Sequence, residues 1–238
     1  MPPRAEVEHM KRKQLTAIIV ISSFGLVPIA SAQHNSHSAP SLTQPSTAPP
    51  VVGLSGALIP ARDLPDRLKN GGFLIVMRHE RTEIPSRDDD YSKPPTDCLS
   101  QRNLSVAGLA GAGETGVALR VAGVAIARVI ASPMCRTMET ARAAFGRADT
   151  DARLMHFDPS VTGAFEVRRE ETLALANGLQ LGTDNVVLVT HAPNLSAFDV
   201  RLGEGEMAVL RKNAVGQWVL IGRATGSEWG FVARGLAQ

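Results

Sequence analysis

Two short apolar runs constrain the fold of this 238-residue chain more than any other feature. Residues 73–77 (FLIVM) and 186–190 (VVLVT) do not alternate apolar and polar positions, and residues 127–131 (ARVIA) repeat the pattern more weakly. Strands with this pattern are buried on both faces of a parallel sheet. Helical stretches accompany the strands at residues 63–69, 105–121, 135–145 and 166–179. This alternation predicts an α/β protein, a three-layer α/β/α sandwich with a mostly parallel sheet.

The C-terminal part of the chain has a different pattern. Residues 207–210, 217–221 and 228–232 are short strand-like pieces separated by glycine or polar turns. They predict antiparallel strands that extend one edge of the sheet. Residues 111–116 (GAGETG) match the dinucleotide-binding pattern but lie inside a predicted helix, whereas that pattern requires a turn between strand and helix. Glycines that allow close helix packing are the better interpretation.

The long segment between the first strand and the first long helix, residues 80–103, has no periodicity and contains two successive prolines. A loop of this length inside a compact domain is usually functional. Its acidic run, residues 88–90, is more typical of a solvated loop than of a cation site. Hard-cation sites need more oxygen ligands in a defined order.

The N-terminal segment has the order of features found in secretory signals. Basic residues precede the apolar run 15–30, which is short for a bilayer span and leads into Ala30-Ser31-Ala32. Residues 1–32 are therefore predicted to be a signal peptide, with an uncleaved membrane anchor as the alternative. Residues 33–55, rich in Ser, Thr, Pro, Gln and His, are expected to form a disordered linker before a folded domain at 56–238.

This organisation predicts a periplasmic or secreted protein with no stable membrane span after signal cleavage. The formal charge of +2, from 25 basic and 23 acidic residues, gives no electrostatic case for a nucleic-acid partner. Export would place the only two cysteines, Cys98 and Cys135, in an oxidising compartment where they can pair. The sequence is compatible with one disulfide and also with two free thiols.

Charged and nucleophilic side chains follow each of the three predicted strands. Arg78-His79 follows the first strand, Arg136 comes five residues after the second, and His191 follows the third. In open α/β sheets, ligands bind beyond the carboxyl ends of the strands. Two guanidinium groups and two imidazoles at that edge suit a compact dianion, because arginine offers paired N–H donors to phosphate oxygens.

These residues, in this order, resemble a known family. Arg78-His79, the segment 132–136 (SPMCR) and Thr190-His191 are similar to the motifs of the histidine phosphatase superfamily, which has the phosphoglycerate-mutase-like fold. The resemblance extends from about residue 57 to residue 221. The stretch 97–105 further resembles small bacterial phosphatases of this superfamily, including lipopolysaccharide-core heptose phosphatases. The resemblance implies an exported phosphomonoesterase in which His79 forms a phosphohistidine, without a metal or another cofactor.

The resemblance also assigns roles to individual side chains. The implied ligands of the phosphoryl oxygens are Arg78, Arg136 and His191, with Arg81 and Arg102 as further candidates. A carboxylic acid between the second arginine and the last histidine-bearing strand would protonate the leaving oxygen. Asp158 and Glu166 are the candidates there, and Asp158 is preferred because Glu166 begins a helix, where an acidic residue favours the N-terminus.

The expected partner is a small phosphorylated molecule, such as an envelope sugar phosphate. Glu80 departs from the family pattern, which commonly has glycine at this position, and would weaken phosphate binding if its carboxylate pointed into the site. Two alternatives to hydrolysis therefore stay open: phosphoryl transfer to an acceptor other than water, and a non-catalytic module that binds phosphorylated envelope sugars.

Overall fold

The computed structural model describes residues 57–86 and 88–229, all of which belong to the unit formed by residues 48–238. The predicted signal peptide and the whole of the predicted linker lie outside the described residues. Among the described helices, none is both long and apolar enough to cross a membrane.

A six-stranded sheet forms the centre of the described domain. Its strands are β1 Leu74–Arg78, β2 Ile126–Ala131, β3 Asp149–Thr150, β4 Asn185–Thr190, β5 Glu206–Lys212 and β6 Trp218–Thr225. Their spatial order is β3-β2-β4-β1-β5-β6. The first four strands run parallel, whereas β5 is antiparallel to β1 and β6 is antiparallel to β5. The predicted antiparallel edge is thus confirmed for two of its three strands. Of the third, predicted at 228–232, the structure describes only residues 228 and 229, and the prediction is wrong there because these residues are helical.

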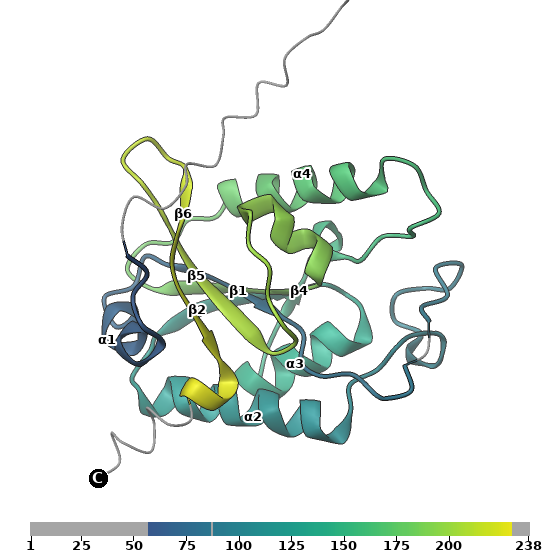
Figure 1. The fold of residues 1–238 in the computed structure, drawn as a ribbon, viewed down its shortest axis with the longest axis horizontal. Helices are drawn as coiled ribbons and strands as arrows, with labels where there is room; N and C mark the ends of the chain where they lie inside the picture. The colour runs from purple at the N-terminus through teal and green to yellow at the C-terminus, as the bar shows by residue number, and fades with distance from the viewer. Residues whose placement is uncertain (1–56, 87, 230–238) are drawn as a thin grey trace, which may run out of the picture. The chain divides into compact units, whose positions relative to one another are not determined.

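Helices cover both faces of the sheet, which confirms the predicted three-layer sandwich. The α-helices are α1 Leu64–Leu68, α2 Val106–Val121, α3 Cys135–Phe145 and α4 Ala164–Asn177. The short 3₁₀ helices are η1 Ala61–Asp63, η2 Cys98–Ser100, η3 Ala152–Leu154 and η4 Ala192–Phe198. Residues of α1, α2 and α3 pack into one apolar cluster, and residues of α4 and η4 pack into a second. Figure 1 shows α2 and α3 on one side of the sheet and α4 on the other.

The unbroken apolar strands follow directly from this layering. Along β1, Leu74 and Val76 belong to one apolar cluster, whereas Ile75 and Met77 belong to the other. Successive side chains of a strand point to opposite faces, so a strand covered on both faces must be apolar at every position. The register of β1 and β4 pairs Leu74 with Val186, so both strands end at the same level of the sheet.

The glycines of α2 allow close packing, as predicted. Ser105 caps the helix, and its Oγ accepts a hydrogen bond from the N–H of Gly108 at 3.0 Å. A Cβ atom added at Gly116 would lie 1.8 Å from the carbonyl oxygen of Ala144 in α3. The two helices therefore touch through a glycine, and residues 111–116 lie inside α2 rather than in a turn between strand and helix.

Candidate active site

The carboxyl ends of β1, β2 and β4 bring the predicted site residues together. His79 and His191 directly follow β1 and β4, and their ring centroids lie 5.4 Å apart. Both histidines are 1% exposed, and the side chain of Arg136, at the start of α3, is fully buried. The backbone N–H of His79 continues the sheet by bonding to the carbonyl oxygen of Thr190 at 2.9 Å. The sheet register therefore places both imidazoles at one edge, as expected.

His79 is held as a neutral imidazole with one free nitrogen. Its Nδ1 lies 2.8 Å from the backbone carbonyl oxygen of Glu80. A carbonyl oxygen only accepts hydrogen bonds, so Nδ1 carries the proton and Nε2 keeps its lone pair. Burial, together with the positive charges of Arg136 and Arg78, lowers the pKa of His79 to about 3. At neutral pH Nε2 is therefore available as a nucleophile.

His191 is hydrogen-bonded through its other ring nitrogen, Nε2. Its Nε2 lies 2.9 Å from Oγ of Ser132, and this oxygen also accepts the backbone N–H of Met134 at 3.3 Å. A hydrogen bond donated by the Ser132 hydroxyl to Nε2 would place the ring proton of His191 on Nδ1. Burial lowers the pKa of His191 well below its ordinary value, so the ring is neutral and presents one N–H donor.

The arginines at the site are held by backbone and carboxylate oxygens. Arg136 donates from both terminal nitrogens to the carboxylate of Asp89, at 2.9 and 3.0 Å. Arg78 donates to the carbonyl oxygen of Leu202 at 3.1 Å and to the Glu204 carboxylate at 3.4 Å. The positive charge of Arg102 helps to lower the pKa of His79, so the structure also brings this predicted residue close to the site.

Several buried donors around the two histidines remain unpaired. Within the described residues, no hydrogen-bond partner exists for Nε of Arg78, Arg102 and Arg136 or for Nδ1 of His191. A buried donor without a partner costs free energy, and native structures contain few of them. Four such donors on neighbouring cationic and imidazole side chains form an environment that suits an anion with several oxygen acceptors.

Two other predicted residues have partners elsewhere. Arg81 approaches the Glu80 carboxylate at 3.9 Å and donates to the carbonyl oxygen of Ala107 at 3.5 Å. The Glu80 carboxylate lies against Gly111 and Gly205, in a separate cavity that Arg81 also lines. Burial raises the pKa of Glu80. The expected weakening of phosphate binding therefore does not apply, because this carboxylate points away from the histidine pair.

The two predicted acids are placed differently. The Asp158 carboxylate accepts the backbone N–H and the hydroxyl of Ser160 at 2.9 and 2.7 Å, and these bonds lower its pKa. Glu166 is exposed in the first turn of α4. Neither carboxylate is among the hydrogen-bond or ion-pair partners of Arg78 or Arg136 within the described residues.

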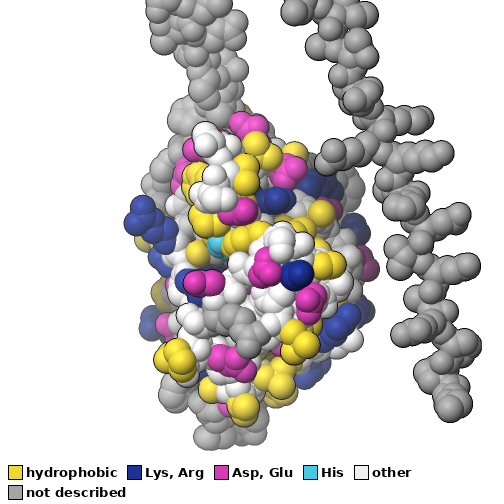
Figure 2. All heavy atoms as spheres, turned by 90° about the vertical axis from the view of Figure 1, so that its right-hand side faces the viewer, with side chains coloured by type: hydrophobic (Ala, Val, Ile, Leu, Met, Phe, Trp, Pro, Cys, Tyr) yellow, Lys and Arg dark blue, Asp and Glu magenta, His cyan; other side chains and the backbone are white. Residues whose placement is uncertain are grey.

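A hydrogen-bonded pair that the sequence analysis did not use lies beside the site. The Tyr91 hydroxyl is 2.6 Å from Nδ1 of His156, and the His156 ring meets His191 edge-on at 5.5 Å. Burial and the charge of Asp89 raise the pKa of Tyr91 to about 12. In Figure 1 the loop after β1 and the loop before α4 lie on the same side, and Figure 2 shows a small area of histidine surface on that face.

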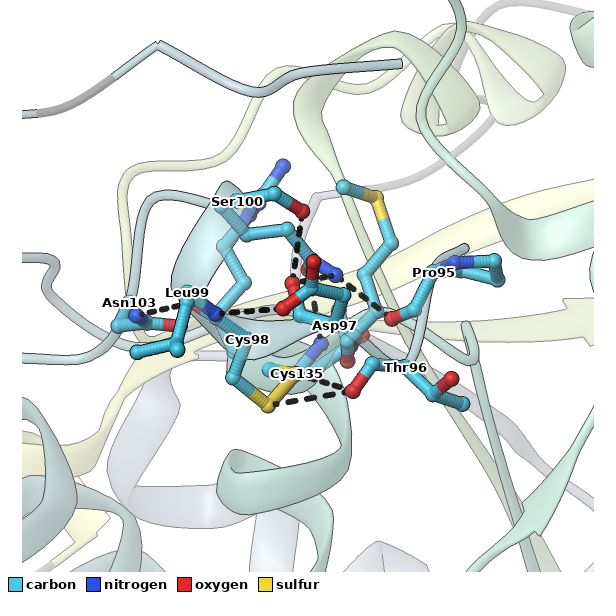
Figure 3. Close-up of a disulfide and its surroundings, with 12 residues drawn as sticks. Pro95, Thr96, Asp97, Cys98, Leu99, Ser100, Asn103 and Cys135 are labelled. Atoms are coloured by element: carbon cyan, nitrogen blue, oxygen red, sulfur yellow. Dashed lines mark hydrogen bonds between the residues drawn. A yellow bond between two sulfur atoms is a disulfide. The ribbon is translucent and has the colours of Figure 1, made fainter. Parts of the chain in front are cut away.

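The long loop after β1 is fastened to the site by a disulfide. Cys98 and Cys135 are bonded, with their Cα atoms 5.6 Å apart, which decides between the two alternatives that the sequence left open. Cys135 immediately precedes Arg136, so the bond ties the loop to the start of α3 (Figure 3). The side chain of Gln101 adds a second tie, because its Oε1 accepts the backbone N–H of Cys135 at 3.1 Å.

Sequence reasoning missed several side chains that support the site: Ser132, Asp89, Glu204 and Tyr91. Ser132 belongs to the motif that carried the resemblance, and that motif was the signal that could have revealed its role. Nothing in the sequence separates Asp89 from the acids on either side of it. In residues 57–86 and 88–229, no three His, Cys, Asp or Glu side chains are grouped so that they could hold a metal ion.

Comparisons with known proteins agree with this architecture. No protein-family model matches the sequence, and no curated protein matches it. Among solved structures, a candidate alpha-ribazole-5′-P phosphatase from Escherichia coli K-12 is 18% identical with a TM-score of 0.52, and the match covers 65% of this chain and 97% of that one. A mycobacterial glucosyl-3-phosphoglycerate phosphatase is 15% identical with a TM-score of 0.50, and the match covers 65% of this chain and 100% of that one.

A third structure, the protein histidine phosphatase SixA complexed with tungstate, is 16% identical with a TM-score of 0.45, and the match covers 65% of this chain and 97% of that one. At these identities the likeness concerns the fold. The described domain therefore has the phosphoglycerate-mutase-like fold.

Proposed function

We propose that this chain is an exported phosphomonoesterase that hydrolyses a phosphate ester through a phosphohistidine on His79. One observation carries the proposal: a neutral His79 with a free Nε2 lies beside His191 and two arginines that have unpaired buried N–H groups. A nucleophile and a set of anion-binding donors at the same sheet edge are what phosphoryl transfer requires.

The reaction follows from the hydrogen bonds of these groups. Nε2 of His79 attacks phosphorus, the bond to the leaving oxygen breaks, and water later hydrolyses the phosphohistidine. Arg78, Arg136 and Nδ1–H of His191 hold the phosphoryl oxygens and stabilise the charge that spreads over them in the transition state. The two guanidinium groups supply the positive charge, so the proposed mechanism uses no metal.

The proposed substrate is a small phosphorylated molecule, such as an envelope sugar phosphate. Support comes from the names of two structural neighbours, one a candidate phosphatase for alpha-ribazole-5′-P and the other a phosphatase for glucosyl-3-phosphoglycerate. The proposed location, periplasmic or secreted, rests on the signal-peptide pattern of residues 1–32.

The test is hydrolysis by wild type and by His79→Ala. We expect wild type to release phosphate from p-nitrophenyl phosphate and from a panel of sugar phosphates. The variant should keep its fold by circular dichroism and lose at least about a thousandfold in rate, because no other group replaces the nucleophile. Brief exposure to labelled substrate should leave phosphate on His79 in wild type only.

The remaining outcomes decide between the alternatives. Equal phosphate release by both proteins would refute the enzymatic proposal. Transfer of the label to an added alcohol in preference to water would show a phosphotransferase, and phosphate binding without turnover would show a binding module. The structure weakens the case for the binding module, because the Glu80 carboxylate lies away from the histidines.

A further inference from the structure

The terminal nitrogens of Arg136 are hydrogen-bonded to the carboxylate of Asp89. Both oxygens of Asp89 accept hydrogen bonds from them, at 2.9 and 3.0 Å, and one oxygen also accepts the backbone N–H of Arg102 at 3.0 Å. The Arg136 side chain is fully buried, and that of Asp89 is 9% exposed. This is a paired, charge-assisted contact inside the site rather than a surface ion pair.

The paired geometry has a consequence for phosphate binding. A planar guanidinium binds phosphate through the same two parallel N–H groups with which it binds a carboxylate. A phosphoryl group that binds across the terminal nitrogens of Arg136 must therefore exchange with the Asp89 carboxylate. Because Asp89 is covalently part of the loop that the disulfide ties to α3, the displaced carboxyl stays beside the phosphate that replaces it.

The exchange also changes the acidity of Asp89. Burial opposes its ionisation in the free protein, but the hydrogen bonds from Arg136 and Arg102 and the charge of Arg136 outweigh burial and lower its pKa. The other groups facing it are the Tyr91 hydroxyl, 3.5 Å away, and His156. Exchanging the Arg136 contact for a neighbouring phosphate dianion removes the stabilising bonds and adds repulsion, and both changes favour the protonated acid.

From this exchange, and resting on the proposed phosphatase reaction, we propose that Asp89 is the catalytic acid that protonates the leaving oxygen. The substrate enters in part as a monoanion, since phosphate monoesters lose their second proton near pH 6. Its proton passes to Asp89 as the phosphate takes the nitrogens of Arg136. Nε2 of His79 then bonds to phosphorus while the bond to the leaving oxygen breaks, and that oxygen takes the Asp89 proton. In the second step water bonds to phosphorus while the bond between phosphorus and Nε2 of His79 breaks, and the Asp89 carboxylate accepts a proton from that water.

Asp158 is the competing carboxylate. It lies close enough for its charge to raise the pKa of Tyr91, but its own carboxylate is bonded in a turn by the N–H and hydroxyl of Ser160. Asp89, in contrast, contacts the side chain that is proposed to bind the phosphate.

Leaving-group dependence tests the assignment. A strongly acidic leaving group such as p-nitrophenol needs little protonation, whereas the alcohol of glycerol phosphate needs it fully. In Asp89→Asn we expect kcat to fall about 100- to 1000-fold with glycerol phosphate and less than about tenfold with p-nitrophenyl phosphate, as expected for loss of a general acid. Asp88→Asn, which removes the same charge from the neighbouring exposed position, is the matched control and should show no selective loss.

Two further measurements keep the assignment falsifiable. If Asp89→Asn loses the same factor with both substrates, Asp89 only positions Arg136, and if Asp158→Asn shows the selective loss, Asp158 is the acid. Calorimetry with inorganic phosphate provides a readout besides turnover. If phosphate displaces the Asp89 carboxylate from Arg136, Asp89→Asn should bind phosphate as tightly as wild type or more tightly. Weaker phosphate binding by this variant would overturn the proposed exchange. If wild type hydrolyses the substrates and Asp89→Asn shows no selective loss, this inference alone is refuted. If wild type hydrolyses neither substrate, the proposed function is refuted as well.

Discussion

At the scale of single residues, the reactive groups could be predicted from the sequence but their partners could not. His79 and His191 were recognisable because each follows an apolar strand, and strand ends of a parallel sheet meet at one edge. The partners come from distant parts of the chain: Asp89 is 47 positions from Arg136, and Ser132 is 59 positions from His191. Contacts over such separations depend on the tertiary fold, and neither an acidic run nor a serine predicts them.

Ser132 provides a test of the His191 tautomer. Ser132→Ala removes the hydroxyl that bonds Nε2, so the ring proton is no longer fixed on Nδ1, where it is proposed to contact the phosphate. We expect kcat/KM to fall roughly 10- to 100-fold, the equivalent of one charge-assisted hydrogen bond of about 1.5–3 kcal/mol. The control is Ser196→Ala, which removes a hydroxyl that donates to the carbonyl oxygen of Pro193. Undiminished kcat/KM in Ser132→Ala would show that its hydroxyl does not set the tautomer.

At the scale of helices and strands, the sequence located the long elements and the short helix α1 but missed the strand β3. Strand β3 has two polar residues, Asp149 and Thr150, which are too few to show any period. The helical turn at 226–229 did have a signal. Glu228 accepts the backbone N–H of Thr225 at 2.7 Å, and the Thr225 hydroxyl accepts the N–H of Glu228 at 3.3 Å. This is a capping box, which marks a helix start and should have outweighed the strand-like composition.

The glycines of α2 give a prediction about how this helix packs. In Gly116→Ala the new methyl group would meet the Ala144 carbonyl oxygen, which is backbone and cannot move aside easily. We expect α2 and α3 to be forced apart and the free energy of unfolding to fall by about 2 kcal/mol or more, as for other overpacked sites. Gly113→Ala, with nothing within 4 Å of its added Cβ, should instead stabilise by about 0.5–1 kcal/mol through helix propensity. Urea unfolding of both variants measures these changes in the free energy of unfolding. Equal changes in the two variants would contradict the close contact of α2 and α3 at Gly116.

At the scale of the whole molecule, a nearly neutral chain gathers several arginines beside two buried histidines. The formal charge of +2 gave no indication that Arg102 and Arg136 act on both buried histidines and that Arg78 acts on His79. The number of charges is visible in the sequence, but their local concentration depends on which strand ends are neighbours. The same concentration keeps the imidazoles neutral, since burial and positive neighbours both disfavour the imidazolium.

These buried imidazoles should make stability depend on pH. The pKa values of His79, His156 and His191 are all lowered by folding, so below pH 6.5 the unfolded chain binds protons that the folded chain does not. The unfolding free energy should therefore fall as pH drops from 7.5 to 5.5, by at most about 1.4 kcal/mol per pH unit for each histidine. This window lies above the range in which carboxylates with lowered pKa values, such as Asp89, contribute. Urea unfolding at several pH values should give a shallower dependence for His79→Asn than for wild type. Parallel curves would mean that His79 accepts a proton without cost in the folded protein, and its burial would then not account for a neutral nucleophile.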